Sequence, residues 1–257
     1  MDLSLILASC FMSLVGLPHG ALDPVVAHRC GLIRDIRSSL LFFAAYAGLV
    51  SIVVGFWLLL PQISLIIFLF ISCIHFGRDW KNHLSFGGFG YGAWVLGLPA
   101  FTAPTEVEEI FSFLIYQTEA EASLIFLQII GATSAVLLWI DRTRLSVVRI
   151  AELFILAVSA YLLEPLWFFV VYFCGFHSPR HIVAEFRAMK KEARFKAYVV
   201  MLLTTILTLA IAAISGSHLE RYHMNIDMLI YQIIFIGLAA LTVPHMCLLE
   251  WVERQAK

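Results

Sequence analysis

Five histidines of this chain lie at or near the ends of long apolar segments, and this placement indicates a metal site. They are His19, His75, His177, His181 and His245. A neutral imidazole is a good ligand for iron, zinc or copper, and ionisable groups inside apolar spans are costly and usually functional. A single histidine of this kind is more often a hydrogen-bond partner between helices. Because the chain has several such histidines, we predict a metal site.

Two of these histidines are followed by an aspartate four residues later. The segments are His19-Gly-Ala-Leu-Asp23 and His75-Phe-Gly-Arg-Asp79. On an α-helix, residues four apart share a face. Such an aspartate could orient the imidazole by accepting its hydrogen bond, or it could cap the bundle or pair with an arginine.

A third pattern is the HxxxH pair His177-Ser-Pro-Arg-His181, with Glu185 four residues further on. Pro179 disfavours α geometry at the residue before it and cannot donate a hydrogen bond to the preceding turn. The helix could kink here, or it could end and restart with Pro179 in its first turn. In either case the two histidines stay close enough along the chain to share a metal.

We therefore expect one metal centre with no further catalytic side chain. Its predicted ligands are His19, His75, His177 and His181. Its predicted supporting residues are Asp23, Asp79, Glu185 and His245, and His245 could also be a fifth metal ligand or line the substrate pocket. The other four histidines, His28, His83, His218 and His223, are interpreted as solvated loop residues.

The composition indicates that lipid covers much of the protein. The 257 residues are 61% apolar and 14% charged, and the mean hydropathy is +0.90. Soluble domains have about 45–50% apolar and roughly 25% charged residues. The net charge of −1 provides no basic field, so no nucleic-acid partner is expected. The five cysteines form no CxxC pair, which argues against a thiolate zinc site.

A membrane-spanning helix needs about 20 apolar residues, and the chain has nine candidate segments. A total of eight spans is also possible. The predicted fold is an all-α, polytopic transmembrane bundle that forms one integral membrane domain over residues 1–257. The fourth span is rich in glycine, which favours close packing of helices in lipid. The nine spans cover about 3–18, 38–60, 63–77, 86–102, 121–140, 147–163, 166–178, 195–215 and 226–249.

The basic residues predict the orientation of these spans. Cytoplasmic loops carry an excess of Lys and Arg. With the N-terminus outside and the C-terminus inside, all of the 17 Lys and Arg residues except Arg221 fall on the inner side. The five histidines then lie toward the same side, although the orientation depends on Lys and Arg alone. We expect a multi-pass protein of the cell membrane with its metal site toward the cytoplasmic face.

The histidine segments also carry a resemblance to a known family. Residues 18–23, Pro-His-Gly-Ala-Leu-Asp, resemble the PHGALD signature of the Brp/Blh family. Residues 75–79, 177–181 and 244–245 are similar to its other histidine blocks, in the same order along the chain. The family comprises bacterial and archaeal membrane β-carotene 15,15′-dioxygenases.

This resemblance implies an activity and a cofactor. It implies iron(II) held by His19, His75, His177 and His181, which all match the family motifs. It implies that O2 adds across the central double bond of β-carotene to give two all-trans-retinal molecules. The implied partners are β-carotene, O2 and membrane lipid, with a functional link to a microbial rhodopsin.

Other functions stay open at this point. A membrane di-iron desaturase or hydroxylase usually needs about eight histidines with HxxHH boxes, and this chain has no HxxHH. A metal transporter would be expected to place its ligands near the midplane of the membrane. A bis-histidine haem protein, a purely structural protein, and a dioxygenase for another carotenoid or apocarotenoid are further alternatives.

Overall fold

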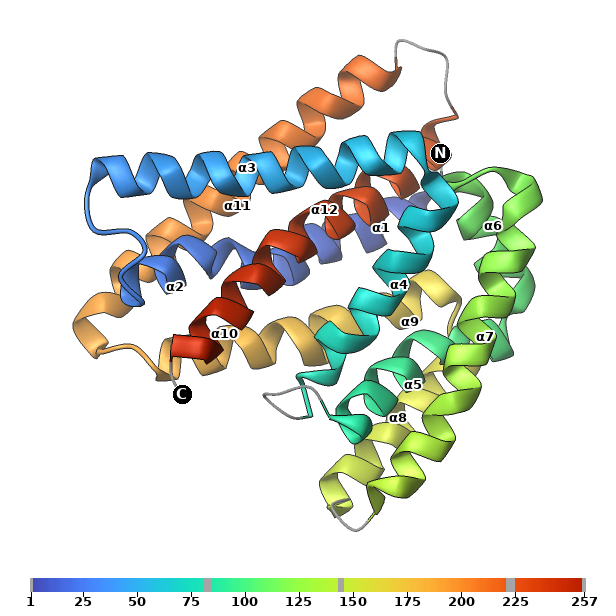
Figure 1. The fold of residues 1–257 in the computed structure, drawn as a ribbon. Helices are drawn as coiled ribbons and strands as arrows, with labels where there is room; N and C mark the ends of the chain where they lie inside the picture. The colour runs from blue at the N-terminus through green and yellow to red at the C-terminus, as the bar shows by residue number, and fades with distance from the viewer. Residues whose placement is uncertain (1, 81–84, 143–145, 221–224, 256–257) are drawn as a thin grey trace. The chain divides into compact units, whose positions relative to one another are not determined.

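The protein is helical throughout the part of the chain that the structure describes. The structure is a computed structural model (Figure 1), and it describes residues 2–80, 85–142, 146–220 and 225–255. No strand occurs among these residues, which confirms the predicted all-α class. Some residues used in the sequence predictions lie outside the described residues, namely Lys81, His83, Arg144, Arg221, His223 and Lys257.

The contacts within the chain divide it into two compact units. Unit 1 comprises Met1–Leu59 and Ser178–Lys257, and unit 2 comprises Leu60–His177. The single membrane domain expected over residues 1–257 stays a prediction.

Unit 1 contains the two ends of the chain. Its elements are α1 (Leu3–Phe11), η1 (Met12–Gly16), η2 (Leu17–Leu22), α2 (Asp23–Arg29), α3 (Ile36–Leu59), α10 (Ser178–Arg187), α11 (Lys191–Glu220) and α12 (Ile226–Gln255). The long helix α12 packs beside α3, and both α10 and α11 pack against η2 (Figure 1). The short segment η2 is therefore surrounded by helices from the C-terminal part of the chain.

Unit 2 is built around the glycine-rich helix α5. Its elements are α4 (Pro61–Gly77), α5 (Phe86–Thr102), α6 (Pro104–Leu114), α7 (Gln117–Ile140), α8 (Val147–Leu162), α9 (Pro165–Tyr172) and η4 (Phe173–His177). Helix α5 packs against α4 and α7. A Cβ atom on Gly92 would lie 2.0 Å from the carbonyl oxygen of Cys73, and one on Gly97 would lie 2.4 Å from the Cα of Gly131. These glycines let the backbones touch, as predicted for this span.

All nine predicted spans are helical in the structure, and five helical segments are long and apolar enough to cross a membrane. These five, among the described residues, are Leu3–Arg29, Ile36–Leu59, Gln117–Ile140, Lys191–His218 and Ile226–Gln255. Pro61–Gly77 is apolar but shorter. The structure is thus consistent with an integral membrane protein. The count of nine and the orientation of the termini stay predictions.

Two loop assignments from the sequence are wrong. His28 lies in the last turn of α2 and His218 in the last turn of α11. Polar residues at the end of an apolar stretch can continue its helix, because the backbone hydrogen bonds need no apolar side chain. His28 also makes a hydrogen bond of 2.8 Å between its Nδ1 and the carbonyl of Ile33.

Candidate metal centre

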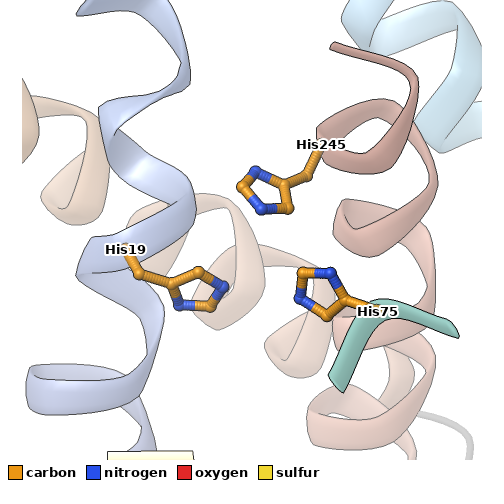
Figure 2. Close-up of side chains that lie close together, drawn as sticks. All are labelled: His19, His75 and His245. Atoms are coloured by element: carbon orange, nitrogen blue, oxygen red, sulfur yellow. The ribbon is translucent and has the colours of Figure 1, made fainter. Parts of the chain in front are cut away.

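Unit 1 brings three of the five histidines together. His19 lies on η2, His181 on α10 and His245 on α12. The ring centroids are 5.4 Å apart for His19 and His245, 5.8 Å for His19 and His181, and 6.0 Å for His181 and His245. Figure 2 shows the rings of His19 and His245 turned toward each other from two separate helical segments. Histidines more than 60 residues apart in sequence thus form one imidazole cluster.

His19 is positioned by a change of helix type. The π-helical turn η1 precedes it, and the 3-10 segment η2 carries it together with Pro18. Proline lacks an N–H and its ring clashes with the carbonyl four residues earlier in a regular α-helix. A π turn before it interrupts the regular hydrogen-bond ladder. The helical path therefore continues to Arg29, whereas the sequence had predicted that the first span ends at about residue 18.

The hydrogen bond of His19 determines its tautomer. Its Nδ1 lies 2.6 Å from the carbonyl oxygen of Gly16. A carbonyl oxygen can only accept, so Nδ1 carries the proton and donates it. In the neutral ring, Nε2 then keeps its lone pair, which is the form that binds a metal.

His245 is held by the carboxylate of Asp23. The Nδ1 of His245 and the Oδ1 of Asp23 are 2.7 Å apart, and both side chains are buried. The hydroxyl of Tyr46 donates to the other oxygen of Asp23 at 2.9 Å. The spacing in the sequence had pointed to His19 as the partner of Asp23. In the 3-10 geometry of η2, residues four apart are about 120° apart around the axis, so the i+4 argument does not apply there.

His181 and Glu185 lie on α10, which is tied to the first helical path. The buried hydroxyl of Ser178 donates to the carbonyl oxygen of Val15 at 2.6 Å. Glu185 forms an ion pair of 2.8 Å with Arg29. The contact that the structure gives to Glu185 is thus with an arginine at the end of α2.

Unit 2 holds the other two histidines. His75 lies in the last turn of α4 and His177 ends η4, and their ring centroids are 4.6 Å apart. Both rings are buried, with 3% and 0% of their surface exposed. Phe173 stacks on His177 at 5.5 Å, and Phe76 meets it edge-on at 4.9 Å. The pair therefore lies in an apolar, aromatic environment.

The carboxylate of Asp79 is bonded to His177. The Nδ1 of His177 lies 3.0 Å from the Oδ1 of Asp79, and the hydroxyl of Tyr172 donates to Oδ2 at 2.8 Å. The sequence had pointed to His75 as the partner. Helix α4 ends at Gly77, so Asp79 lies in the turn beyond it and the spacing of an α-helix does not extend to it.

The backbone stays helical through Pro179. The π turn η4 follows α9 directly, and α10 begins at Ser178 without an irregular residue between them. The alternatives that the sequence left open are thereby resolved in favour of a continuous helical path with a π turn just before the proline. The same order, a π turn followed two residues later by proline, occurs at Pro18.

These features suit a transition metal. His19, His177 and His245 each use Nδ1 toward an oxygen acceptor, and this directs Nε2 to act as the metal-binding nitrogen. The Nε2 atoms of His177 and His245 are buried. Neutral nitrogen donors of this kind are suited to iron, copper or zinc. The histidine clusters could therefore bind a metal.

Tyr46 and Tyr172 are the residues that the sequence analysis missed. They are separated from their aspartates by 23 and 93 positions. Tyrosines are common in apolar segments, and no spacing rule connects residues so far apart. Only the packed helices show that each hydroxyl completes a Tyr–Asp–His chain of hydrogen bonds.

An apolar helical protein with carboxylate-supported histidines has the features of a membrane protein that could bind a metal, and comparisons with known proteins identify its family. The model of the beta-carotene 15,15′-dioxygenase family matches residues 10–253. A beta-carotene 15,15′-dioxygenase from uncultured marine bacterium 66A03 is 30% identical over 95% of this chain and 94% of its own length. No solved structure matched the chain. The chain belongs to the beta-carotene 15,15′-dioxygenase family, whose members are carotenoid-cleaving dioxygenases.

Proposed function

We propose that this protein uses iron(II) and O2 to cleave the central 15,15′ double bond of β-carotene into two all-trans-retinal molecules. The family supports cleavage of β-carotene. The observation that carries the metal part is the set of imidazoles whose Nδ1 atoms are bonded to oxygen acceptors. The ligands expected from the sequence, His19, His75, His177 and His181, would hold the iron.

The histidine nitrogens that would bind the iron are consistent with this chemistry. Bound iron(II) would supply the activation of O2. Both oxygen atoms enter the two aldehyde products as one carbon–carbon double bond breaks, so the reaction needs no external reductant and no proton donor. The task of the protein is to hold the imidazoles, to orient the polyene and to exclude water. The buried aromatic surroundings of His177, formed by Phe76 and Phe173, suit an apolar substrate.

The setting in the membrane matches the substrate. β-Carotene dissolves in the lipid bilayer, and many large apolar side chains on α3, α8 and α11 are exposed on the protein surface. We propose a cell-membrane protein of about nine spans, with the N-terminus outside and the metal site toward the cytoplasmic face. Retinal made there would be available to a microbial rhodopsin.

Expression in cells that accumulate β-carotene tests the proposal. The orange colour should fade and retinal should appear in the extract, with two retinal molecules for each β-carotene lost. Alanine at His19, His75, His177 or His181 should each abolish this conversion, whereas His218→Ala, an exposed histidine at the end of α11, should retain it. Persistent colour in well-expressed membranes would contradict the proposal. Products of other chain lengths would instead indicate another carotenoid or another bond.

A further inference from the structure

The imidazole cluster of unit 1 has three members, although the sequence pointed to only two of them as ligands. The sequence left open whether His245 only supports the site or is itself a fifth ligand. The three rings are nearly equally spaced, with centroid distances of 5.4 Å for His245 and His19, 6.0 Å for His245 and His181, and 5.8 Å for His19 and His181. One ring nitrogen of His245 lies within 4.8 Å of one of His19. Two nitrogens bound to one metal through bonds of about 2.1 Å lie at most about 4 Å apart, so a small side-chain adjustment brings both onto one ion.

The support of His245 repeats the support of His177. In unit 2 the chain of hydrogen bonds runs from the Tyr172 hydroxyl to Asp79 and from Asp79 to Nδ1 of His177. In unit 1 it runs from the Tyr46 hydroxyl to Asp23 and from Asp23 to Nδ1 of His245. The two series of hydrogen bonds use the same types of atom in the same order. An arrangement of this kind fixes the ring orientation and raises the basicity of Nε2, as carboxylates behind metal-bound histidines do.

We propose that His245 is itself a metal ligand beside His19 and His181, and that Asp23 and Tyr46 are its positioning residues. The inference rests on the proposed function, because it adds a ligand to the same centre. A histidine needed only to bridge α12 and α2 would satisfy Asp23 with Nδ1, and its other edge could face apolar side chains. Here the rings of two more histidines, His19 and His181, lie with their centroids 5.4 and 6.0 Å from that of His245.

The test compares metal binding by purified full-length variants. His245→Ala and His245→Gln should lower the iron bound per chain, and the ligand-field spectrum of the cobalt(II)-substituted protein should change because one nitrogen donor is lost. Added imidazole should restore iron binding to His245→Ala. Asp23→Asn should weaken iron binding by about 10- to 100-fold, and Tyr46→Phe should weaken it by less. His218→Ala is the matched control and should bind like the wild type.

Two outcomes separate this inference from the proposed function. If both His245 variants bind iron like the wild type and give an unchanged cobalt spectrum, His245 is not a ligand and the inference is overturned, even if the enzyme cleaves β-carotene. If wild-type protein binds iron through His245 but releases no retinal, the inference stands and the proposed function fails. Should His245→Ala not fold, the gentler changes His245→Gln and Asp23→Asn still decide between these results.

Discussion

Two aspartates in this protein each connect a tyrosine hydroxyl to an imidazole. Asp79 joins Tyr172 to His177, and Asp23 joins Tyr46 to His245. The pairs that they form with the histidines span 98 and 222 positions of the chain. The spacing in the sequence suggested that each aspartate could orient the histidine four residues before it, and the structure shows each aspartate bonded to a histidine far along the chain. The local helix type and the long-range packing determine which histidine each aspartate binds, and the i+4 spacing predicts neither of them.

At this scale, Asp79→Asn should weaken metal binding. The amide keeps the shape of the side chain but loses the charge that favours the Nδ1–H form of His177, so iron affinity should fall about 10- to 100-fold. The measurement is iron per chain at limiting free iron(II). Asp2→Asn is the matched control, because Asp2 is an exposed cap of α1 and asparagine caps equally well. Full iron occupancy and full activity in Asp79→Asn would refute this role.

The helices themselves were largely predictable, and their irregular turns were not. Each predicted span coincides with a helical segment to within a few residues at most of its ends, because long apolar runs must satisfy their backbone groups internally. The first and seventh spans are exceptions. They were expected to end near Pro18 and Ser178, and the helical path continues after a π turn to Arg29 in the first case and to Arg187 in the second. A sequence pattern with a fixed period cannot reveal one widened turn.

The hydrogen bond from Ser178 should matter to the helical path that carries His19. Its hydroxyl is fully buried and donates to the carbonyl oxygen of Val15 in the π turn. Ser178→Ala leaves that carbonyl without this donor and should cost about 1–3 kcal/mol of stability. Thermal unfolding of the purified protein should show a lower midpoint. Ser217→Ala, which removes an exposed hydroxyl from α11, should leave the midpoint unchanged, and equal midpoints for both variants would argue against the role of Ser178.

The contact of α5 with α4 should not tolerate a methyl group. A Cβ on Gly92 would lie 2.0 Å from the carbonyl oxygen of Cys73, which is backbone and cannot rotate away. Gly92→Ala should therefore destabilise unit 2 by about 1–3 kcal/mol or more. Gly55→Ala on α3 meets open space and should be neutral or slightly stabilising. The same unfolding measurement compares the two, and a Gly92→Ala protein as stable as wild type would contradict this packing.

At the scale of the whole molecule, charge asymmetry predicts the orientation. All Lys and Arg residues but Arg221 fall on one side if the N-terminus is outside and nine spans alternate. The residues at which the helices begin and end do not determine this orientation, because a helix forms the same hydrogen bonds whichever way it crosses a membrane. The separation into two units was also not visible in the sequence, since the apolar spans follow one another without a linker.

The orientation can be checked with reporters fused to the C-terminus. A fluorescent protein that matures only in the cytoplasm should fluoresce, and a phosphatase that is active only outside should stay inactive. A fusion after Ala103, the residue between α5 and α6, should give the opposite pattern. An active phosphatase at the C-terminus would show that the span count or the orientation is wrong.

We propose that a histidine-held iron centre in this protein splits a carotenoid. The most direct measurement is the amount of retinal formed from β-carotene by purified protein at a series of iron contents. We predict two retinal molecules per β-carotene consumed, with O2 required and with a rate proportional to bound iron. Equal rates from iron-free and iron-loaded protein, or no retinal from fully loaded protein, would contradict the claim.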